Sequence, residues 1–307
     1  MLTTTATIDE LISDSLKGAD ESSLREKYFA QDEFVIVEEF LAQEVISRWN
    51  LELEKLKPNV HRNYLPGHKK GGSVAYATVN VFAPSITAVY QSAPLLGFLR
   101  RVVGAEMNEC PPDDSHRCAL YAYTDEGDHM GWHYDTSYYK DRRWTVLAGL
   151  KDESSSRLLC RLHTRNPNRD VAELEVQIKP GTLVIFNGDK VYHAVSPLKK
   201  GESRYVVSMQ YVTIGEMNPF MRFISNMKDA VAYFGLRGVF GRKAGSITSF
   251  KYSDAVKSAN VIWDASSLDQ WLTDPDKLIP DSDMGFRLSN ATDRSDVIAY
   301  LKQLSNK

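Results

Sequence analysis

The sequence predicts a mostly β fold with flanking helices, closed into a sandwich or barrel and followed by a small helical segment. Between Cys118 and Thr213, apolar side chains recur mostly at every second position, which is the period of a β-strand. Turn signals such as Pro180-Gly181 and Asn187-Gly188 separate the apolar runs, and short strands at regular spacing are typical of sandwiches and barrels. After Gly215 the pattern changes to helices and irregular loops.

The length and composition are those of an ordinary globular protein. The 307 residues are enough for about two domains, and 43% apolar with 25% charged residues excludes a disordered chain or a coiled coil. A net charge of −3 predicts no nucleic-acid partner, and no apolar run reaches the roughly 18 residues of a membrane span. The N-terminus lacks a signal-peptide pattern and three cysteines are too few for a disulfide framework, so we expect a cytoplasmic protein.

The elements before residue 118 combine helices with two strands. Leu41, Val45, Trp49 and Leu53 recur every four residues, which predicts a helix over 40–57. The other expected elements are a polar helical region at 1–30, strands at 32–37 and 73–82, a loop at 58–72 and a helix at 93–103.

Seven strands are expected in the β region that follows. They lie at 118–124, 143–150, 157–163, 173–178, 182–186, 191–196 and 203–213. We place a domain boundary near 214–219. This gives a first domain at 1–215, with a β core at about 73–213, and a second domain at 216–307.

A His-X-Asp pair is the first candidate for a metal site. His133 and Asp135 stand at a predicted strand end, where the strand period of two places both side chains on one face. In isolation, a structural hydrogen bond explains this pair equally well. His193 lies in another predicted strand, and closure of the sheet would bring it to the pair. Two imidazoles and one carboxylate on one face of an octahedral metal are the ligands of a non-haem Fe(II) oxygenase.

Arg204 lies on the next predicted strand, eleven residues after His193. Its planar guanidinium matches a carboxylate, so beside a metal it would anchor the far carboxylate of a dicarboxylic co-substrate.

Residues 30–213 resemble the Fe(II)/2-oxoglutarate-dependent dioxygenases, and among them the prolyl-hydroxylase-like branch. The resemblance rests on His133-X-Asp135, on His193 with the run Gly181–Phe186 before it, and on Arg204. It implies a double-stranded β-helix fold, of the jelly-roll or cupin-like kind, with Fe(II) bound by the three predicted ligands.

The same resemblance implies 2-oxoglutarate as the co-substrate, held by Arg204, and O2 as the oxidant. Tyr123 occupies the position of a tyrosine that contacts the co-substrate in family members, although it also reads as a core tyrosine of a strand. The halogenating relatives have a small residue at the position of Asp135. A carboxylate there favours hydroxylation, desaturation or ring closure over halogenation.

Several residues are candidates for substrate contact, and each also has a structural explanation. Trp132 and Tyr134 flank the ligands but equally read as core aromatics, and Arg142 or Arg143 at the next strand start would meet an anionic substrate or remain solvated. Weaker candidates come from the stretch that covers the site in the family: Arg62, Asn63, Tyr76 and Asn80.

A second resemblance covers residues 232–307. The run Leu236–Ser246 is similar to the glycine-rich loop of class I cytochrome c. The similarity continues through Phe250–Ala255, Ile262–Asp264, Leu272–Pro275, Ile279-Pro280, Met284, Phe286 and a last helix over Asp293–Lys302.

The haem ligands of that family are missing, with one exception. Cytochrome c requires a Cys-X-X-Cys-His segment, whereas this chain has no cysteine after Cys160 and no histidine after His193. Met284 matches the axial methionine but has no partner ligand. We therefore expect no haem and interpret the segment as a helical packing module, in which residues 219–234 either replace the missing N-terminal helix or pack in the place of the haem. The apolar stripe of the last helix is expected to bury in its own core, in a homodimer interface or as a lid.

Together these features predict an Fe(II)- and 2-oxoglutarate-dependent oxygenase. The expected substrate is a small molecule such as an amino acid or a specialised metabolite. A protein hydroxylase acting on a prolyl or similar side chain is the alternative. A non-catalytic or redox partner module built on the cytochrome-like half is a second alternative, and the missing cysteines and histidines argue against it.

Overall fold

The computed structural model describes residues 6–65, 68–112, 114–135, 137, 139–216, 239–246, 252–282, 287–288 and 291–305. The chain divides into two compact units, Met1–Met221 and Arg222–Lys307, which are described separately.

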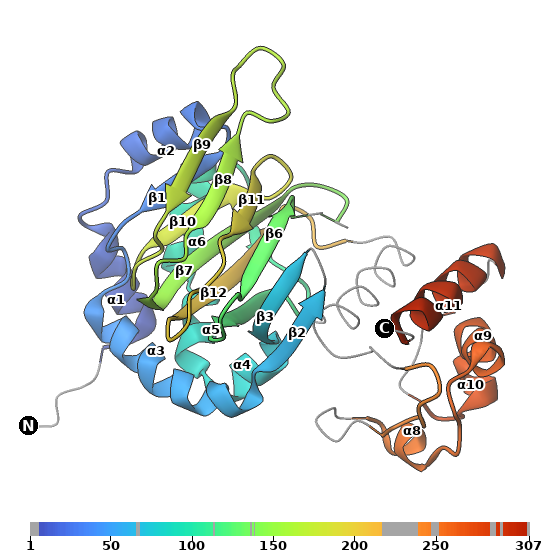
Figure 1. Ribbon diagram of the computed structural model, residues 1–307. Coiled ribbons are helices and arrows are strands. Elements are labelled where there is room, and N and C mark those ends of the chain that lie inside the picture. The colour runs from blue at the N-terminus through green and yellow to red at the C-terminus, as the bar shows by residue number, and fades with distance from the viewer. Residues whose placement is uncertain are drawn as a thin grey trace, which may run out of the picture. The chain divides into compact units, whose positions relative to one another are not determined.

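The first unit is built on one antiparallel sheet with helices on one side (Figure 1). Its helices are α1 (Ile8–Leu16), α2 (Glu21–Ala30), α3 (Gln43–Leu56), the 3-10 turn η1 (Lys57–Asn59), α4 (Tyr76–Phe82), α5 (Pro84–Tyr90) and α6 (Ala93–Val103). Its strands are β1 (Phe34–Val37), β2 (His61–Leu65), β3 (Lys69–Val74), β4 (Asn108–Glu109), β5 (Cys118–Tyr123), β6 (His129–His133), β7 (Arg143–Glu153), β8 (Leu158–Leu162), β9 (Ala172–Val176), β10 (Leu183–Asn187), β11 (Tyr192–Val195) and β12 (Ser203–Val212).

The sheet curls back on itself, and this curl makes the jelly roll that the sequence predicts. Its strand order is β1-β10-β7-β12-β5-β3-β6-β11-β8-β9, with β2 beside β3 and β4 beside β12. In Figure 1, β9, β8, β11 and β6 form a front layer, and β1, β10, β7 and β12 lie behind it. The β3–β6 pairing joins the two layers. The expected fold class is therefore confirmed for this unit.

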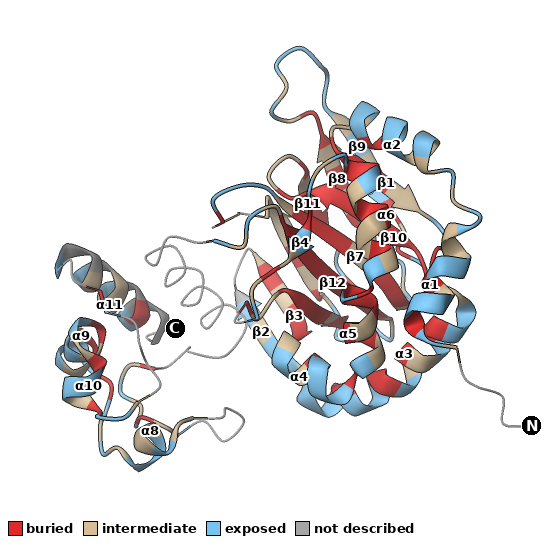
Figure 2. Cartoon of the chain, turned by 180° about the vertical axis from the view of Figure 1, so that it is seen from behind, coloured by how far each residue is buried: buried red, intermediate tan, exposed pale blue. Residues whose placement is uncertain are grey.

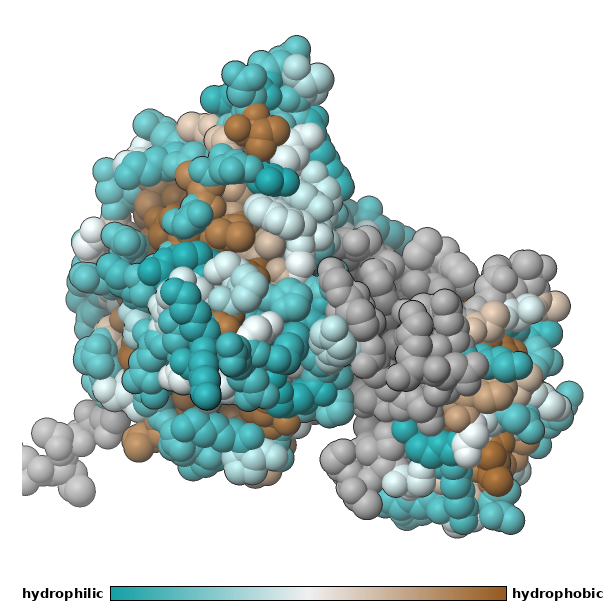
Figure 3. Space-filling view, viewed as in Figure 1, coloured by the Kyte–Doolittle hydropathy of each residue, from teal (hydrophilic) through white to brown (hydrophobic). Residues whose placement is uncertain are grey.

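Two apolar cores hold the unit together. The larger one lies between the helices and the outer side of the back layer, as seen from behind in Figure 2, and includes Trp49, Phe98 and Trp144. The smaller one lies inside the curl and includes Phe34 and Phe186. In the view of Figure 3, the described surface of this unit is mostly hydrophilic, and apolar side chains show mainly beside β1 and β10.

Two predicted elements differ from the structure. The expected loop over 58–72 contains most of η1, all of β2 and the first residues of β3. Instead of a strand over 73–82, β3 ends at Val74 and α4 begins at Tyr76. Val79 and Ala83 are buried while Val81 and Phe82 are exposed. This spacing of four is the helical period, and it overrides the β-forming residues of the segment.

The second unit has its own small core. Its described helices are α8 (Asp254–Ser258), α9 (Ala265–Thr273), α10 (Pro275–Leu278) and α11 (Ala291–Ser305). Trp263 and Trp271 meet edge to face, with 5.3 Å between the ring centroids, which is within the roughly 4.5–7 Å of favourable aromatic pairs. Leu301 of α11 is buried in the same core, as the apolar stripe predicts. Residues 219–234, which were expected to pack in the haem-free segment, lie outside the described residues, as does Met284.

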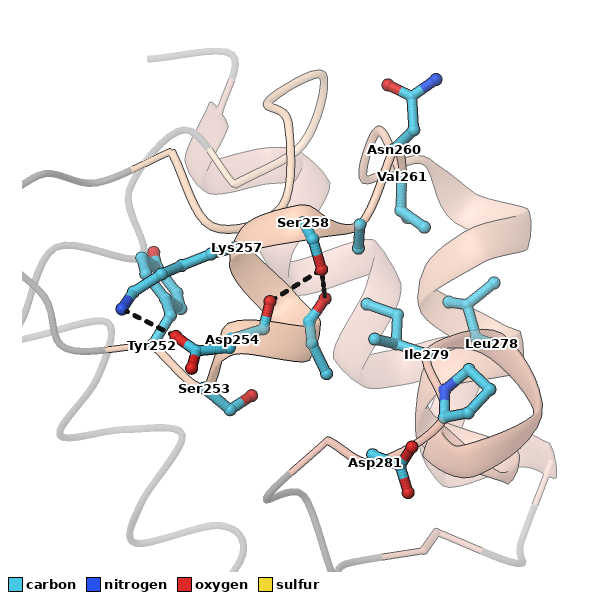
Figure 4. Close-up of a pocket in the computed structure, with 13 residues that line it drawn as sticks. Tyr252, Ser253, Asp254, Lys257, Ser258, Asn260, Val261, Leu278, Ile279 and Asp281 are labelled. Atoms are coloured by element: carbon cyan, nitrogen blue, oxygen red, sulfur yellow. Dashed lines mark hydrogen bonds and ion pairs between the residues drawn. The ribbon is translucent and has the colours of Figure 1, made fainter.

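A pocket of about 1100 Å³ opens in this second unit (Figure 4). It lies between the segments 252–261 and 278–281, and its lining includes the ion pair of Asp254 with Lys257. None of the predicted metal ligands lines it. In the described parts of both units, no helix has the length and apolar character of a bilayer span.

Candidate metal centre

Two neighbouring strands bring the two predicted histidine ligands together. β6 and β11 are antiparallel, and His133 is directly paired with His193 across them. The pairing shifts between His193 and Val195, which is a bulge of the kind that re-aims side chains near active sites. The two imidazole centroids lie 4.2 Å apart. Asp135 follows the end of β6, so the local backbone places all three side chains at one mouth of the roll.

Ligand atoms of these three residues converge. One atom each from His133, Asp135 and His193 lies within 4.8 Å of the others, and this is the one such cluster of histidine, cysteine and acidic side chains in the described part of the chain. Asp135 Oδ1 is 3.5 Å from Nε2 of His133 and 3.8 Å from Nε2 of His193.

Backbone contacts prepare both imidazoles to bind a cation. Nδ1 of His133 lies 2.8 Å from the carbonyl oxygen of Gly131, and Nδ1 of His193 lies 3.0 Å from that of Val191. Because a carbonyl only accepts, each Nδ1 carries the proton and donates it. Each Nε2 then turns its lone pair toward Asp135, which is the arrangement of metal-ligating histidines.

The charges of the cluster fit the same role. Burial lowers the pKa of His193 to about 4, so this imidazole is neutral near pH 7. Burial alone would raise the pKa of Asp135, but His193, His133 and the hydroxyl of Thr145 outweigh it and hold the pKa below its ordinary value. A neutral imidazole beside a carboxylate anion is a donor set that suits a divalent transition metal.

Arg204 and Tyr123 lie side by side on neighbouring strands. They are directly paired across β12 and β5, and the guanidinium lies 5.8 Å from the centroid of the Tyr123 ring. Arg204 is 1% exposed, and its Nε and Nη1 have no hydrogen-bond partner among the described residues. A buried cation with unpaired donors fits the carboxylate of an absent ligand, so the residues present suit 2-oxoglutarate.

The two aromatic substrate candidates face away from the cluster. Trp132 stacks on Tyr192 at 5.3 Å, and Tyr134 packs on the same ring at 4.9 Å. Trp132 and Tyr192 each precede a histidine of the cluster, and neighbouring residues of a strand point to opposite faces. The expectation that Trp132 and Tyr134 line the substrate pocket is therefore not supported by their placement. Arg161 lies over the Trp132 ring instead.

The remaining substrate candidates also lie elsewhere. Arg142 is exposed. Arg62 pairs with the buried Asp128 at 2.6 Å and with Asp125, and so anchors the turn before β6. Tyr76 packs against the larger core on the helix side of the sheet, under the guanidinium of Arg117.

A polar network that the sequence did not reveal surrounds Asp135. Thr145 of β7 donates to Asp135 Oδ2, and Gln210 of β12 lies 3.0 Å from the same hydroxyl. Arg143 donates from Nε to Gln210 Oε1 at 3.0 Å and lies 3.9 Å from Asp114. Arg143 and Thr145 share one face of β7, so strand alternation from either residue would have indicated the other.

Family models match the first unit. Residues 118–211 match the model of the 2OG-Fe(II) oxygenase superfamily, which covers all three cluster residues together with Tyr123 and Arg204. Residues 17–140 match a model described as Halogenase D, and this stretch includes His133 and Asp135.

Solved structures share the fold at low identity. The epimerase SnoN from nogalamycin biosynthesis is 13% identical with a TM-score of 0.51, over 62% of this chain and 80% of that one. A prolyl hydroxylase from Trichoplax adhaerens, solved with a hypoxia inducible factor peptide, is 15% identical with a TM-score of 0.52, over 72% of this chain and 98% of that one.

Curated relatives from the cytochrome c family match a stretch of about 70 residues. Cytochrome c2 iso-2 of Magnetospirillum fulvum is 46% identical over 70 residues, which is 22% of this chain and 73% of that protein. Cytochrome c of Euglena viridis is 39% identical over 72 residues, or 71% of its length. In the sequence, the residues that resemble class I cytochrome c lie between Leu236 and Lys302.

Proposed function

The chain belongs to the 2OG-Fe(II) oxygenase superfamily, with a further segment of about 70 residues from the cytochrome c family, and we propose that it hydroxylates a small molecule at the mouth formed by His133, Asp135 and His193. Enzymes of this superfamily use Fe(II), 2-oxoglutarate and O2. When bound, the iron and 2-oxoglutarate supply the chemistry that converts a substrate R–H, O2 and 2-oxoglutarate into R–OH, succinate and CO2.

The observation that carries the proposal is the orientation of the three side chains. Both imidazoles present Nε2 to the space beside Asp135 Oδ1, while each Nδ1 is bound to a backbone carbonyl. We assign His133, Asp135 and His193 as the iron ligands on this basis. Three protein ligands leave the rest of the metal open to co-substrate and O2.

We assign Arg204 to the distal carboxylate of 2-oxoglutarate. Its burial and unpaired donors support this role, because a buried guanidinium gains most from a bidentate partner. Tyr123, against the guanidinium, is proposed to line the co-substrate site.

The carboxylate at position 135 supports hydroxylation over halogenation, despite the match to a halogenase model. Asp135 Oδ1 occupies the third position beside the two imidazoles. A halide would need that position. The side chain is also fixed at its other oxygen by Thr145, so it is not free to make room.

Charged groups near the mouth favour a small polar substrate that carries both charges, such as an amino acid. Arg143 and Asp189 each lie close enough to Asp135 for their charges to interact with its carboxylate. Burial raises the pKa of Asp189. Arg143 would meet an anionic group, and Asp114 or Asp189 a cationic one. Arg143 therefore replaces Arg142 as the arginine we propose for substrate binding.

A screen for substrate-stimulated succinate release tests the proposal. Purified full-length protein with Fe(II), 2-oxoglutarate and O2 is incubated with amino acids and related metabolites, with chloride present. We expect a product that has gained one oxygen atom and no chlorine. A chlorinated product would overturn the reaction type. Activity on a prolyl peptide and on no free metabolite would overturn the small-molecule substrate in favour of a protein hydroxylase.

A further inference from the structure

The second oxygen of Asp135 has a fixed partner. Asp135 Oδ1 faces the imidazoles, and Oδ2 accepts a hydrogen bond from Thr145 Oγ1. Thr145 is 2% exposed, so no bulk water competes for that hydroxyl.

The proton of Thr145 can be assigned from its neighbours. Gln210 Oε1 lies 3.0 Å from the hydroxyl and also accepts from Arg143 Nε at 3.0 Å. Because a guanidinium only donates, Arg143 fixes the Gln210 amide with its oxygen toward Arg143 and Thr145. The amide nitrogen then donates to Ser208 Oγ at 3.0 Å, which is consistent with this orientation.

Thr145 thus has one proton and two acceptors within reach. A carboxylate anion is a stronger acceptor than an amide oxygen, and Gln210 Oε1 is already served by Arg143. The proton therefore belongs to Asp135 Oδ2. Gln210 Oε1 carries no proton to donate to Thr145, so the hydroxyl is held by its hydrogen bond to Asp135 Oδ2.

We propose that Thr145 is a positioning residue that restricts Asp135 to binding a metal through one oxygen. A carboxylate that is free to rotate can bind through both oxygens, and this would take a coordination position from the co-substrate or O2. This inference rests on the proposed metal site, and its test separates the two.

Metal-free full-length protein is titrated with Co(II) without O2, and the Kd is read from the visible absorption of the bound metal. We expect Thr145→Val, which keeps the shape and loses the hydroxyl, to raise the Kd about 10-fold, because binding the metal must then also fix the orientation of the Asp135 carboxylate. Thr145→Ser keeps the hydroxyl and should stay within about 2-fold of the wild type. The matched control is Thr87→Val, because Thr87 is an equally buried threonine of α5 whose hydroxyl has no hydrogen-bond partner among the described residues.

A second readout is the affinity of the Co(II) protein for 2-oxoglutarate. It should fall in Thr145→Val and recover in Thr145→Ser, which a merely structural role would not produce. If Thr145→Val fails to fold, Thr145→Ala gives the answer, since it also removes the hydroxyl without touching Asp135 and should raise the Kd to a similar extent.

Asp135→Ala distinguishes a failure of the positioning role of Thr145 from a failure of the proposed metal site. If Asp135→Ala weakens Co(II) binding while Thr145→Val or Thr145→Ala binds Co(II) and 2-oxoglutarate as the wild type does, the positioning role is wrong and the metal site stands. If Asp135→Ala also binds Co(II) as tightly as the wild type, the proposed metal site itself is wrong.

Discussion

Gly188 and Asp135 are in direct contact. The carbonyl oxygen of Gly188 accepts a hydrogen bond from the backbone N–H of Asp135 at 3.0 Å. A Cβ atom on Gly188 would lie 2.5 Å from Cβ of Asp135, closer than real Cβ contacts come. Gly188, in the turn after β10, and Asp135, two residues after the end of β6, therefore fit together only because position 188 has no side chain.

Gly188→Ala should displace Asp135 and so weaken metal binding. We expect a loss of about 1–3 kcal/mol in the free energy of unfolding from the overpacked contact. Urea denaturation and Co(II) titration measure the two effects. Gly18→Ala is the matched control, since a Cβ there meets nothing within 4 Å and its φ is not positive. Equal behaviour of the two variants would contradict the contact.

His133→Ala, Asp135→Ala and His193→Ala should each abolish turnover and greatly weaken Fe(II) binding, because each removes one ligand. Anaerobic Fe(II) titration and succinate release are the measurements. His129→Ala is the control, as this half-buried histidine of the same strand bonds the Gly127 carbonyl and is not in the cluster. Survival of both binding and turnover in any one ligand variant would disprove that ligand.

Arg204→Lys should raise the KM for 2-oxoglutarate about 10-fold while changing the KM for the substrate much less. Lysine keeps the charge but loses the planar fork that meets a carboxylate with two bonds. Steady-state kinetics with each component varied in turn makes the comparison. An unchanged KM for 2-oxoglutarate would refute the assignment of Arg204.

Glu33 should make the stability of the first unit sensitive to acid. Burial opposes its ionisation, but hydrogen bonds from Lys190 at 2.6 Å and Asn187 at 2.8 Å outweigh burial and lower its pKa. A lowered folded-state pKa means that the stabilisation is present above the unfolded pKa and is lost as pH falls through the folded one. Glu33→Gln should cost about 1–3 kcal/mol at pH 7 and much less near pH 3. A difference from the wild type that is constant with pH would contradict this role.

The purified full-length protein should show no Soret band. Covalent haem needs cysteines, and the chain has no cysteine after Cys160 and no histidine after His193. An absorption spectrum after expression with haem supplied makes the test. A band that remains after desalting would show that the cytochrome-like segment still holds haem.

The strands that are buried on both faces could be predicted from the sequence almost to their ends. The predicted 203–213 is β12 at Ser203–Val212, and the predicted 143–150 is the first part of β7. Dense runs of β-forming residues fix such strands. For the short β6, only a strand end at His133 could be predicted and not the bounds of the strand, because it contains Gly131 and only five residues, and a glycine weakens a strand signal.

The convergence of the three cluster residues could be anticipated, but not the side chains that support them. Whether Arg142 or Arg143 faces the interior depends on the pairing of β7 with β12, where Arg143 is opposite Val212. The contact of Gly188 with Asp135 likewise joins two segments that are far apart in the sequence. Pairings of this kind are set by tertiary structure, so local patterns do not contain them. Trp132 is a different case, because the alternation that turns His133 inward already turns Trp132 outward.

The position of β12 in the sheet has a consequence for the order of folding. It is the last strand named in the described part of the chain, yet it lies between β7 and β5, paired with both. While the chain is being synthesised, β7 and β5 must wait with open edges until Val212 has emerged. Open edges and late, long-range pairing make folding slow and the nascent chain prone to aggregate. A chain stopped before Ser203 would contain every predicted iron ligand and still lack β12, the strand that joins β7 to β5.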